Sequence, residues 1–517
     1  MNVLLMHPDR AFDWQSPLPP QAGDLVQDLG LDVLFGAMAG GDDLMHAVVR
    51  HGLLLSLHDG AEIVYRQQAL TDAIQHAGVI HELHDLASAT LSEEKGIWGW
   101  FTTNPELNLG HAIKVMELLL GKLRVLRQLA SENVDRFTSP AFRRLFATLM
   151  DELDDAYLAE IEEHLERLRF RRGVVVGAGL GPGGSGTGYV LLPPLGSRGR
   201  WLDRVWDRGD PRLRFEIDSR DDGGHQALAE LRIRGINLVA DALSRSCEHV
   251  LGFFTQLRAE LAFYIGCSNL RGALERGGHA TSLPVPQPGA DLGLDATGLY
   301  DAVLALAMEG GVVPNDVSAS GRSLVLITGA NRGGKSTFLR SLGLAQLMMQ
   351  AGAFVPAAAF SSSVASGVFT HFTREEDVTM TRGRLDEELD RMHQVVDLIR
   401  PRAMLLCNES FASTNEREAA EIGEQVFGAL ADTGVRVLLV THLYDLARRL
   451  SRRRPDGTLS LRAERRPDGR RTFKVREGAA LPTSFGQDVY EDVFGGSRRA
   501  AEAGGGTDAA PAAGDRG

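Results

Sequence analysis

The sequence predicts an α/β domain with a parallel sheet, preceded by a mainly α-helical region that contains a small β-rich insert. A glycine-rich motif follows the buried-type apolar run at 324–328 and precedes a helix-forming segment. Two more apolar runs, at 403–407 and 435–440, end in polar residues and alternate with a helical pattern. Upstream of residue 275, apolar residues recur at helical spacing except between 173 and 218.

Length and composition indicate an ordinary globular protein. The chain has 517 residues, 44 % hydrophobic and 24 % charged, which suggests about three or four structural units. We expect no signal peptide, since Met1 to Arg10 has only a short apolar run before His7 and Pro8, and no run approaches the ~20 residues that cross a membrane. Three widely spaced cysteines indicate neither a disulfide framework nor a zinc site. These features favour the cytoplasm.

The net charge of −13 argues against a globally basic nucleic-acid-binding protein. A local basic patch can still bind phosphate when the total charge is acidic, so the charge has to be considered segment by segment.

Residues 1–140 are predicted to form an N-terminal helical core domain. After a proline-punctuated lead-in, helical periodicity runs from Gly23 to about Val134. Breaks fall at Gly40-Gly41, Asp59-Gly60 and 103–105.

Residues 141–275 are predicted to form long lever helices. Ser139-Pro140 is a good N-cap and first-turn pair, and the apolar spacing then continues to Phe170. This pattern predicts one helix of roughly 30 residues. Helical periodicity resumes over 226–274, so we expect two arms that return antiparallel. A coiled-coil dimer helix would give the same pattern.

The β-rich insert at about 173–218 combines arginines and tryptophans with three short β-type runs, at 174–176, 189–192 and 213–217. Trp201 and Trp206 are interleaved among the arginines, and such a mixture can grip a phosphate backbone and stack on bases. A solvated arginine face over core tryptophans explains the same residues and is the simpler interpretation. The candidate DNA contacts are Arg198, Arg200, Arg204 and Arg208.

The predicted nucleotide domain, 276–495, follows a proline-rich link and contains G-x-x-x-x-G-K-[ST] at 329–337. The glycines let backbone N–H groups surround phosphate oxygens, and the next helix adds its positive N-terminus. Lys335 would reach the β- and γ-phosphates, and the Ser336 hydroxyl would bind Mg²⁺. The predicted ATP-binding residues are Gly329, Asn331, Gly333, Gly334, Lys335, Ser336 and Thr337.

Asn408 and Glu409 end the apolar run that begins near Met404. In a P-loop enzyme, the first position carries an acid for the hydration shell of Mg²⁺ and the second carries the residue that activates water. Asn408 can hydrogen-bond a metal-bound water but adds no charge, so we expect weaker Mg²⁺ binding and slow turnover. Glu409 is the predicted catalytic base.

His442 follows the next apolar run, at the edge of the sheet where ligands gather in open α/β folds. A histidine there can hydrogen-bond the γ-phosphate or the attacking water. Beyond it, matching turn signals at 454–457 and 466–469 predict an arginine-rich hairpin. Residues 496–517, rich in Ala, Gly and Asp, are predicted to be disordered.

Together these motifs resemble the DNA mismatch repair MutS family. The resemblance is strong over about 300–495 and weaker over about 25–275. It implies an ABC-type ATPase domain that uses ATP and Mg²⁺. The residues that carry it are Val313-Pro314-Asn315-Asp316, the motif at 329–337, Asn408-Glu409, 410–415, Thr441-His442, Asp32 to Phe35, 260–269 and 483–486.

The resemblance also implies a homodimer in which the loop after the Glu409 strand completes the partner's site. By position, Ser413, Thr414 and Asn415 would be this trans-acting element. The chain departs from the family pattern where Asn408 replaces the acid and Phe411-Ala412-Ser413 replaces Gly-Arg-Gly. It has no room for mismatch-reading and connector domains, and adenine recognition stays unassigned.

The leading hypothesis is a dimeric, MutS-like ATPase in which ATP binding and hydrolysis switch a clamp on double-stranded or branched DNA. A role in repair or recombination, with other DNA-repair proteins as further partners and without classical mismatch reading, fits this hypothesis. The alternative is a nucleotide-gated scaffold that binds ATP, barely hydrolyses it and holds a protein.

Overall fold

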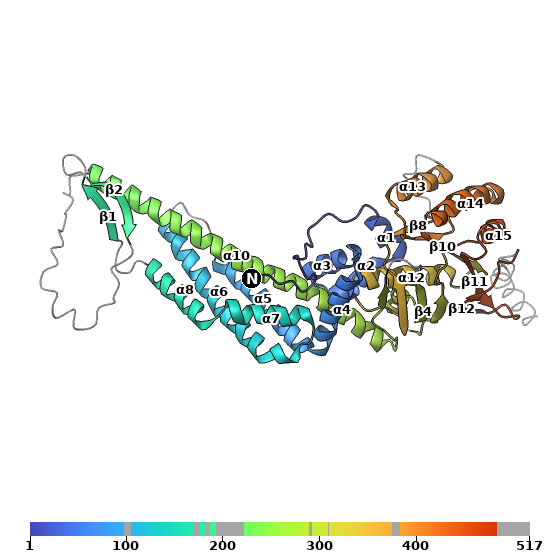
Figure 1. Cartoon of the computed structure of the whole chain (residues 1–517), viewed down its shortest axis with the longest axis horizontal. Coiled ribbons are helices and arrows are strands. Elements are labelled where there is room, and N and C mark those ends of the chain that lie inside the picture. The colour runs from blue at the N-terminus through green and yellow to red at the C-terminus, as the bar shows by residue number, and fades with distance from the viewer. Residues whose placement is uncertain are drawn as a thin grey trace, which may run out of the picture. The chain divides into compact units, whose positions relative to one another are not determined.

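The computed structural model in Figure 1 describes residues 1–97, 105–169, 175–180, 186–192, 222–288, 292–308, 310–374 and 383–482. Contacts divide the chain into two compact units. The first consists of residues 1–12 and 75–261, and the second of residues 13–74 and 262–517. Residues 13–74 thus fall in the same unit as the nucleotide domain. The predicted domain boundaries stay a prediction.

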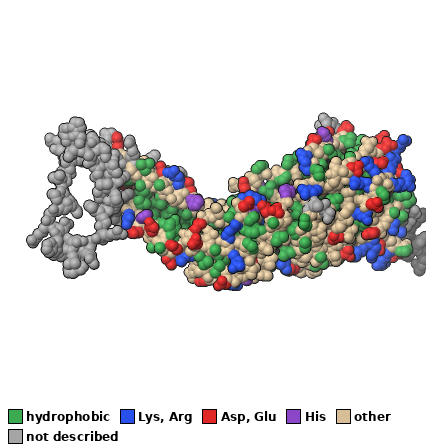
Figure 2. All heavy atoms as spheres, in the orientation of Figure 1, with side chains coloured by type: hydrophobic (Ala, Val, Ile, Leu, Met, Phe, Trp, Pro, Cys, Tyr) green, Lys and Arg blue, Asp and Glu red, His purple; other side chains and the backbone are tan. Residues whose placement is uncertain are grey.

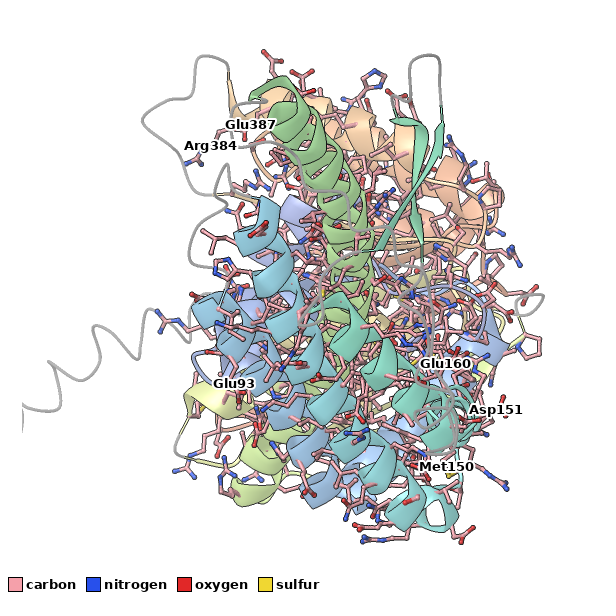
Figure 3. The ribbon with its side chains drawn as sticks, turned by 90° about the vertical axis from the view of Figure 1, so that its left-hand side faces the viewer. Glu93, Met150, Asp151, Glu160, Arg384 and Glu387 are labelled. Carbon is pink, nitrogen blue, oxygen red and sulfur yellow. The ribbon has the colours of Figure 1, made fainter. Side chains whose placement is uncertain are left out.

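The first unit is a bundle of helices in which α6 is central. α6 packs against α5, α7 and α8 through buried leucines such as Leu119 and Leu126, while Glu93 on α5 and Glu160 on α8 are exposed (Figure 3). The elements are α5 (Ala77–Ile97), α6 (Pro105–Asn133), η1 (Val134–Arg136), α7 (Pro140–Glu152), α8 (Asp155–Leu168), β1 (Val175–Leu180), β2 (Gly186–Leu192) and the first part of α10 (Asp222–Arg276).

A buried carboxylate ties the N-terminal segment to α10. Glu260 is fully buried, and its carboxylate accepts hydrogen bonds from the backbone N–H groups of Met6 at 2.9 Å and Phe12 at 3.3 Å. Burial raises the pKa of Glu260, and the hydrogen bonds oppose that shift. One side chain of the long helix therefore fixes the backbone of the N-terminal segment at Met6 and Phe12.

The prediction of one helix from Ser139 to Phe170 is wrong. The helix ends at Leu153, with φ −111° and ψ 43°, and a new one begins after Asp154. Asp154 caps the new helix because its carboxylate accepts from the Tyr157 N–H at 2.7 Å. The apolar spacing continues across this break, which concealed it. The second predicted arm is confirmed as α10, a helix of 55 residues.

In the insert, β1 and β2 pair antiparallel, which confirms the first two β-type runs. The third run, at 213–217, and the four candidate DNA contacts Arg198, Arg200, Arg204 and Arg208 lie outside the described residues, as does the tail from residue 483. No helix in the described ranges is long and apolar enough to cross a membrane.

In the second unit, α3 lies against the C-terminal part of α10 at two glycines. A Cβ on Gly52 would lie 2.5 Å from the Phe263 ring, and one on Gly266 would lie 2.7 Å from Val49 Cγ1. The helices can approach this closely only because both positions lack a side chain. The helices of this part are α1 (Ala22–Leu29), α2 (Leu31–Ala39), α3 (Asp43–Leu54) and α4 (Gly60–Gln75).

The centre of the second unit is a six-stranded sheet of order β12-β11-β6-β10-β9-β8. All neighbouring pairs are parallel except β11 and β12. This confirms the predicted parallel sheet and the C-terminal hairpin. The strands are β6 (Leu324–Gly329), β8 (Val368–Phe372), β9 (Met404–Asn408), β10 (Arg436–Val440), β11 (Thr458–Arg465) and β12 (Arg471–Glu477).

Helices cover this sheet and bury its apolar side chains. A core of residues such as Leu405, Leu439, Phe427 and Leu446 joins β9 and β10 to α14 and α15. Lys and Arg side chains gather at the end that carries α15, β11 and β12 (Figure 2). The helices are α12 (Lys335–Gln350), α13 (Arg384–Leu398), α14 (Glu416–Asp432) and α15 (Tyr444–Arg453).

A second sheet, of order β3-β7-β4-β5, was not predicted. Its strands are short, and β3 lies within the segment that was interpreted as a proline-rich link. The elements are β3 (Val285–Gln287), β4 (Leu294–Leu299), β5 (Asn315–Ser318) and β7 (Ala359–Ser363), with α11 (Ala302–Ala307) between β4 and β5.

Replacing Gly266 with alanine should destabilise the second unit by about 1–3 kcal/mol, because the new methyl group overlaps Val49. Denaturant unfolding measures the change. Gly121→Ala is the matched control, since Gly121 lies in α6 and no atom of another segment lies within 4 Å of its Cβ position. It should stabilise its helix by about 0.5–1 kcal/mol. Equal stability of Gly266→Ala and the wild type would contradict the close packing.

Candidate active site

The loop after β6 is shaped by its glycines. Gly329 has φ 110° and Gly334 has φ 88°, conformations that side chains with a Cβ rarely adopt. A Cβ on Gly333 would lie 2.8 Å from the Ala330 carbonyl oxygen and 2.9 Å from Ala463 Cβ. The loop therefore keeps a narrow backbone cradle at the N-terminus of α12, where N–H groups attract anions.

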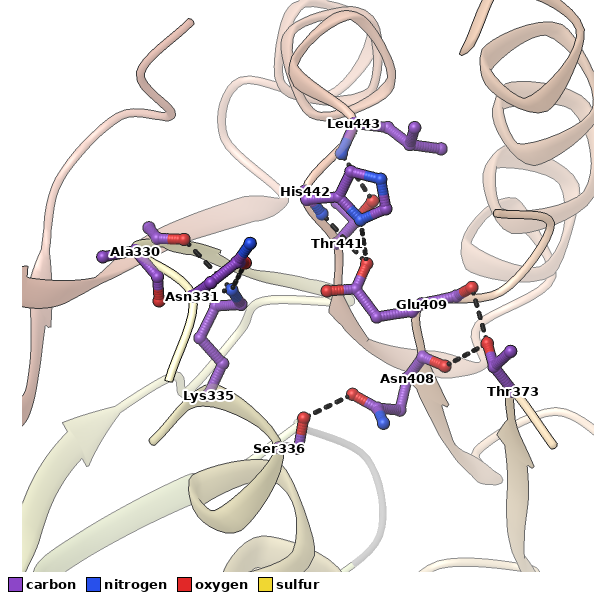
Figure 4. A network of polar contacts seen from close by, with 11 residues as sticks. Ala330, Asn331, Lys335, Ser336, Thr373, Asn408, Glu409, Thr441, His442 and Leu443 are labelled. Atoms are coloured by element: carbon purple, nitrogen blue, oxygen red, sulfur yellow. Dashed lines mark hydrogen bonds and ion pairs between the residues drawn. The ribbon is translucent and has the colours of Figure 1, made fainter. Parts of the chain in front are cut away.

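Lys335 points back into this loop (Figure 4). The residue is only 6 % exposed, and its ammonium donates to the carbonyl oxygens of Gly329 at 3.0 Å and Ala330 at 3.4 Å. Burial lowers the pKa of Lys335, Glu409 opposes this shift and Arg471 adds to it. A buried ammonium beside an open backbone cradle fits the phosphate chain of ATP.

Ser336 and Asn408 meet across the site. The Ser336 hydroxyl donates to Asn408 Oδ1 at 2.8 Å. These are the two residues predicted to hold Mg²⁺, and the structure brings them together. Among the residues that the structure describes, no cluster of three or more His, Cys, Asp and Glu side chains could hold a metal ion. The pair thus offers a hydroxyl and an amide oxygen, both neutral.

Glu409 and His442 are in direct contact. Glu409 Oε2 lies 2.7 Å from His442 Nδ1 and accepts from the His442 backbone N–H at 3.1 Å. The hydrogen bond to Glu409 is the main cause of the raised pKa of His442. The Thr373 hydroxyl donates to the Glu409 carbonyl oxygen at 2.8 Å. Both predicted catalytic residues therefore stand together at the carboxyl end of the sheet.

A cavity of about 610 Å³ adjoins the loop. It is lined by residues of the loop, by Glu409 and by residues that sequence reasoning did not assign to the site. Phe473 reaches it from the C-terminal hairpin, which is fastened to β5 because Asn315 accepts from the Val475 N–H at 2.8 Å. Tyr300 and Val313 contribute further apolar surface. The turn signals of the predicted hairpin were the sequence feature that could have indicated Phe473.

The predicted trans-acting residues have local partners in the chain. Asn415 caps α14 by accepting from the Glu418 N–H at 3.0 Å, and Thr414 donates to the Glu418 carboxylate at 2.6 Å. Ser413 hydrogen-bonds Glu388. None of the three is among the residues that line the cavity. Their role toward a partner subunit stays a prediction.

A glycine-rich loop between a central parallel strand and a helix, with polar residues at the ends of the next two strands of the sheet, β10 and β9, defines the class of P-loop nucleotide-binding folds. Comparison with known families narrows this class. A MutS2 N-terminal domain matches residues 58–277, and MutS domain V matches residues 325–495. Together the two matches cover more than half of the chain. The chain belongs to the MutS family.

Similarity to individual relatives is partial. The DNA mismatch repair protein MutS of Chloroflexus aurantiacus is 27 % identical over 274 residues, which are 51 % of this chain and 28 % of that protein. The MutS 2 protein of Halobacterium salinarum is 31 % identical over 184 residues, 35 % of this chain and 21 % of that protein. MutS of Desulforamulus reducens is 33 % identical over 141 residues, which are 27 % of this chain and 16 % of that protein. The chain thus spans less than a third of the length of these relatives.

Gly333→Ala should lower nucleotide affinity at least about tenfold, a loss of about 1.4 kcal/mol, because its methyl group collides with a backbone oxygen of the cradle. The readout is the rise in melting temperature on adding ATP and Mg²⁺, which should largely disappear. Gly121→Ala, far from the loop in sequence and with an open Cβ position, should keep the full rise. A full rise in Gly333→Ala would show that this loop does not bind the nucleotide.

Proposed function

We propose that this protein is an ATP-dependent DNA-binding protein that hydrolyses ATP at the P-loop site. The observation that carries the proposal is the convergence of the predicted site residues. Lys335 lies in the glycine cradle, Ser336 bonds Asn408, and Glu409 bonds His442, all at one edge of the sheet. Family membership supports the same activity class.

Each of these residues has a chemical role in hydrolysis. Lys335 and the backbone N–H groups of the loop would hold the phosphates, and Ser336 and Asn408 would hold Mg²⁺ through its hydration shell. The ion supplies positive charge to the phosphate oxygens when it is bound. Glu409 would accept the proton of the attacking water, and His442 orients the Glu409 carboxylate through their 2.7 Å contact. Phe473 and Tyr300 would form walls for the base.

The DNA-binding part of the proposal rests on the insert and the family. Arg198, Arg200, Arg204 and Arg208 would contact phosphates, which fixes position but does not read sequence, so the protein would recognise DNA shape. Homodimers, with Ser413, Thr414 and Asn415 completing the partner's site, would form the ATP-switched clamp. Double-stranded or branched DNA in the cytoplasm, and other DNA-repair proteins, are the proposed partners.

One observation favours a second function, a nucleotide-gated scaffold. Asn408 places a neutral amide against Ser336, where an acid would attract Mg²⁺. A site of this kind binds nucleotide and turns it over slowly. In this alternative, ATP binding would control how tightly the lever helices bind a partner protein.

DNA binding should fall steeply with salt. Reversing three of the insert arginines, in Arg198→Glu, Arg200→Glu and Arg204→Glu together, should reduce the slope of log affinity against log salt by about 3. Fluorescence anisotropy with branched and duplex DNA, with and without ATP, measures this slope. The charge-matched control reverses the exposed arginines Arg452, Arg466 and Arg470 of the ATPase domain. No DNA binding by the wild type at low salt would favour the scaffold.

Asn408→Asp should lower the Mg²⁺ concentration needed for half-maximal ATP hydrolysis by about tenfold, because one more negative charge faces the ion. Titrating Mg²⁺ at saturating ATP measures this concentration. Asn237→Asp, which adds the same charge at an exposed position of α10 outside the cavity lining, should leave the concentration unchanged. An unchanged Mg²⁺ requirement in Asn408→Asp would remove Asn408 from the ion site.

A further inference from the structure

The loop after β9 contains two residues in an unusual backbone conformation. Glu409 has φ 55° and Phe411 has φ 64°, and neither is a glycine. A side chain with a Cβ is strained there and stays in place only where its surroundings hold it. The family pattern has glycine at the position of Phe411, and glycine adopts a positive φ without strain. In this chain, other interactions have to hold the loop in that conformation.

Packing holds Phe411. The side chain is fully buried, and its ring centroid lies 5.7 Å from those of both His371 and Phe427. Its backbone N–H donates to the carboxylate of Glu388 on α13. Phe411 is therefore anchored on both its side chain and its backbone.

Hydrogen bonds hold Ser410, the residue between the two strained positions. The Ser410 hydroxyl lies 2.7 Å from His371 Nδ1 and 2.9 Å from the His371 carbonyl oxygen. His371 Nε2 lies 3.0 Å from the Glu388 carbonyl oxygen, which can only accept, so Nε2 carries the proton and Nδ1 is an acceptor. The single proton of the Ser410 hydroxyl is therefore shared between His371 Nδ1 and the His371 carbonyl oxygen. Burial lowers the pKa of His371 to about 4, so this arrangement persists at neutral pH.

Thr373 holds the other strained residue. Its backbone N–H donates to the Asn408 carbonyl oxygen at 3.1 Å, and its hydroxyl donates to the Glu409 carbonyl oxygen at 2.8 Å. His371 and Thr373 lie at the end of β8, which pairs in parallel with β9. One strand end thus fixes the backbone on both sides of Glu409.

We propose that His371, Thr373, Ser410 and Phe411 form a latch that keeps Glu409 in its left-handed conformation, with its carboxylate against His442. His371, Thr373 and Ser410 are positioning residues, since they act on Glu409 and do not line the cavity. The consequence for catalysis rests on the proposed ATP hydrolysis. The geometry itself can be tested without any hydrolysis.

The test uses Ser410→Ala and Thr373→Val in the full chain. Thr373 is exposed, so its variant should fold even if the buried Ser410 substitution does not. Ser366→Ala is the matched control, because the Ser366 hydroxyl also donates to a backbone carbonyl, that of Pro401 at 2.9 Å, near the opposite end of β8. Glu409→Gln gives the pKa of His442 that is expected when the carboxylate is removed.

The first readout is the NMR titration of His442 without nucleotide. The charged groups that act on His442 are Glu409, Lys335 of the P-loop helix and Glu416 of α14. We expect the pKa of His442 to fall from its raised value toward the Glu409→Gln value in both latch variants, and to stay unchanged in Ser366→Ala. A pKa equal to that of the wild type in both latch variants would overturn the proposal, whatever their stability.

The second readout is the kinetics of ATP hydrolysis. We expect kcat to fall about tenfold and KM to change less than twofold, because Lys335 and the glycine cradle are untouched. If the pKa of His442 changes in the latch variants but the wild type does not hydrolyse ATP, the latch is supported and the proposed function is rejected. A kcat loss without a pKa change would reject the latch.

Discussion

The site depends on the in-register pairing of three parallel strands. β10 lies between β6 and β9, with Val440 opposite both Ile327 and Asn408. Because the strands run in the same direction, their carboxyl ends place the glycine-rich loop, Asn408-Glu409 and Thr441-His442 at one edge. A shift of one residue would turn every side chain of a strand to the other face of the sheet. The contact between Glu409 and His442 is the direct product of this register.

The sequence was informative where a motif is contiguous. The glycine-rich loop, Glu409 and His442 each come at the end of an apolar run. The parallel sheet brings these three segments together, as predicted. Phe473 and Tyr300 could not be assigned, because the C-terminal hairpin and the residue after β4 reach the same cavity only in the folded chain. His371 and Ser410 are far apart in sequence, and no pattern links them. The break at Asp154 was missed because the apolar spacing continues past a residue that the helix uses as a cap.

Asn408 is the departure with the largest consequence for function. A carboxylate at position 408 would attract Mg²⁺ by its negative charge, whereas the Asn408 amide offers only a dipole. The rest of the site retains its charges: Lys335 is buried in the cradle and Glu409 bonds His442. Glu409 and Phe411 have positive φ values, and in our proposal packing and hydrogen bonds hold the Glu409 carboxylate in place. In the proposed function, a site with a neutral residue facing the ion and a held base would hydrolyse ATP slowly.

The measurement that tests this account most directly is steady-state ATP hydrolysis by the wild type and by Glu409→Gln, each with and without branched and duplex DNA. The account predicts slow turnover that responds to DNA in the wild type, and a loss of at least about a hundredfold in Glu409→Gln, as expected when a general base is removed. ATP binding without hydrolysis in either protein, and no response to DNA, would contradict it and favour the scaffold.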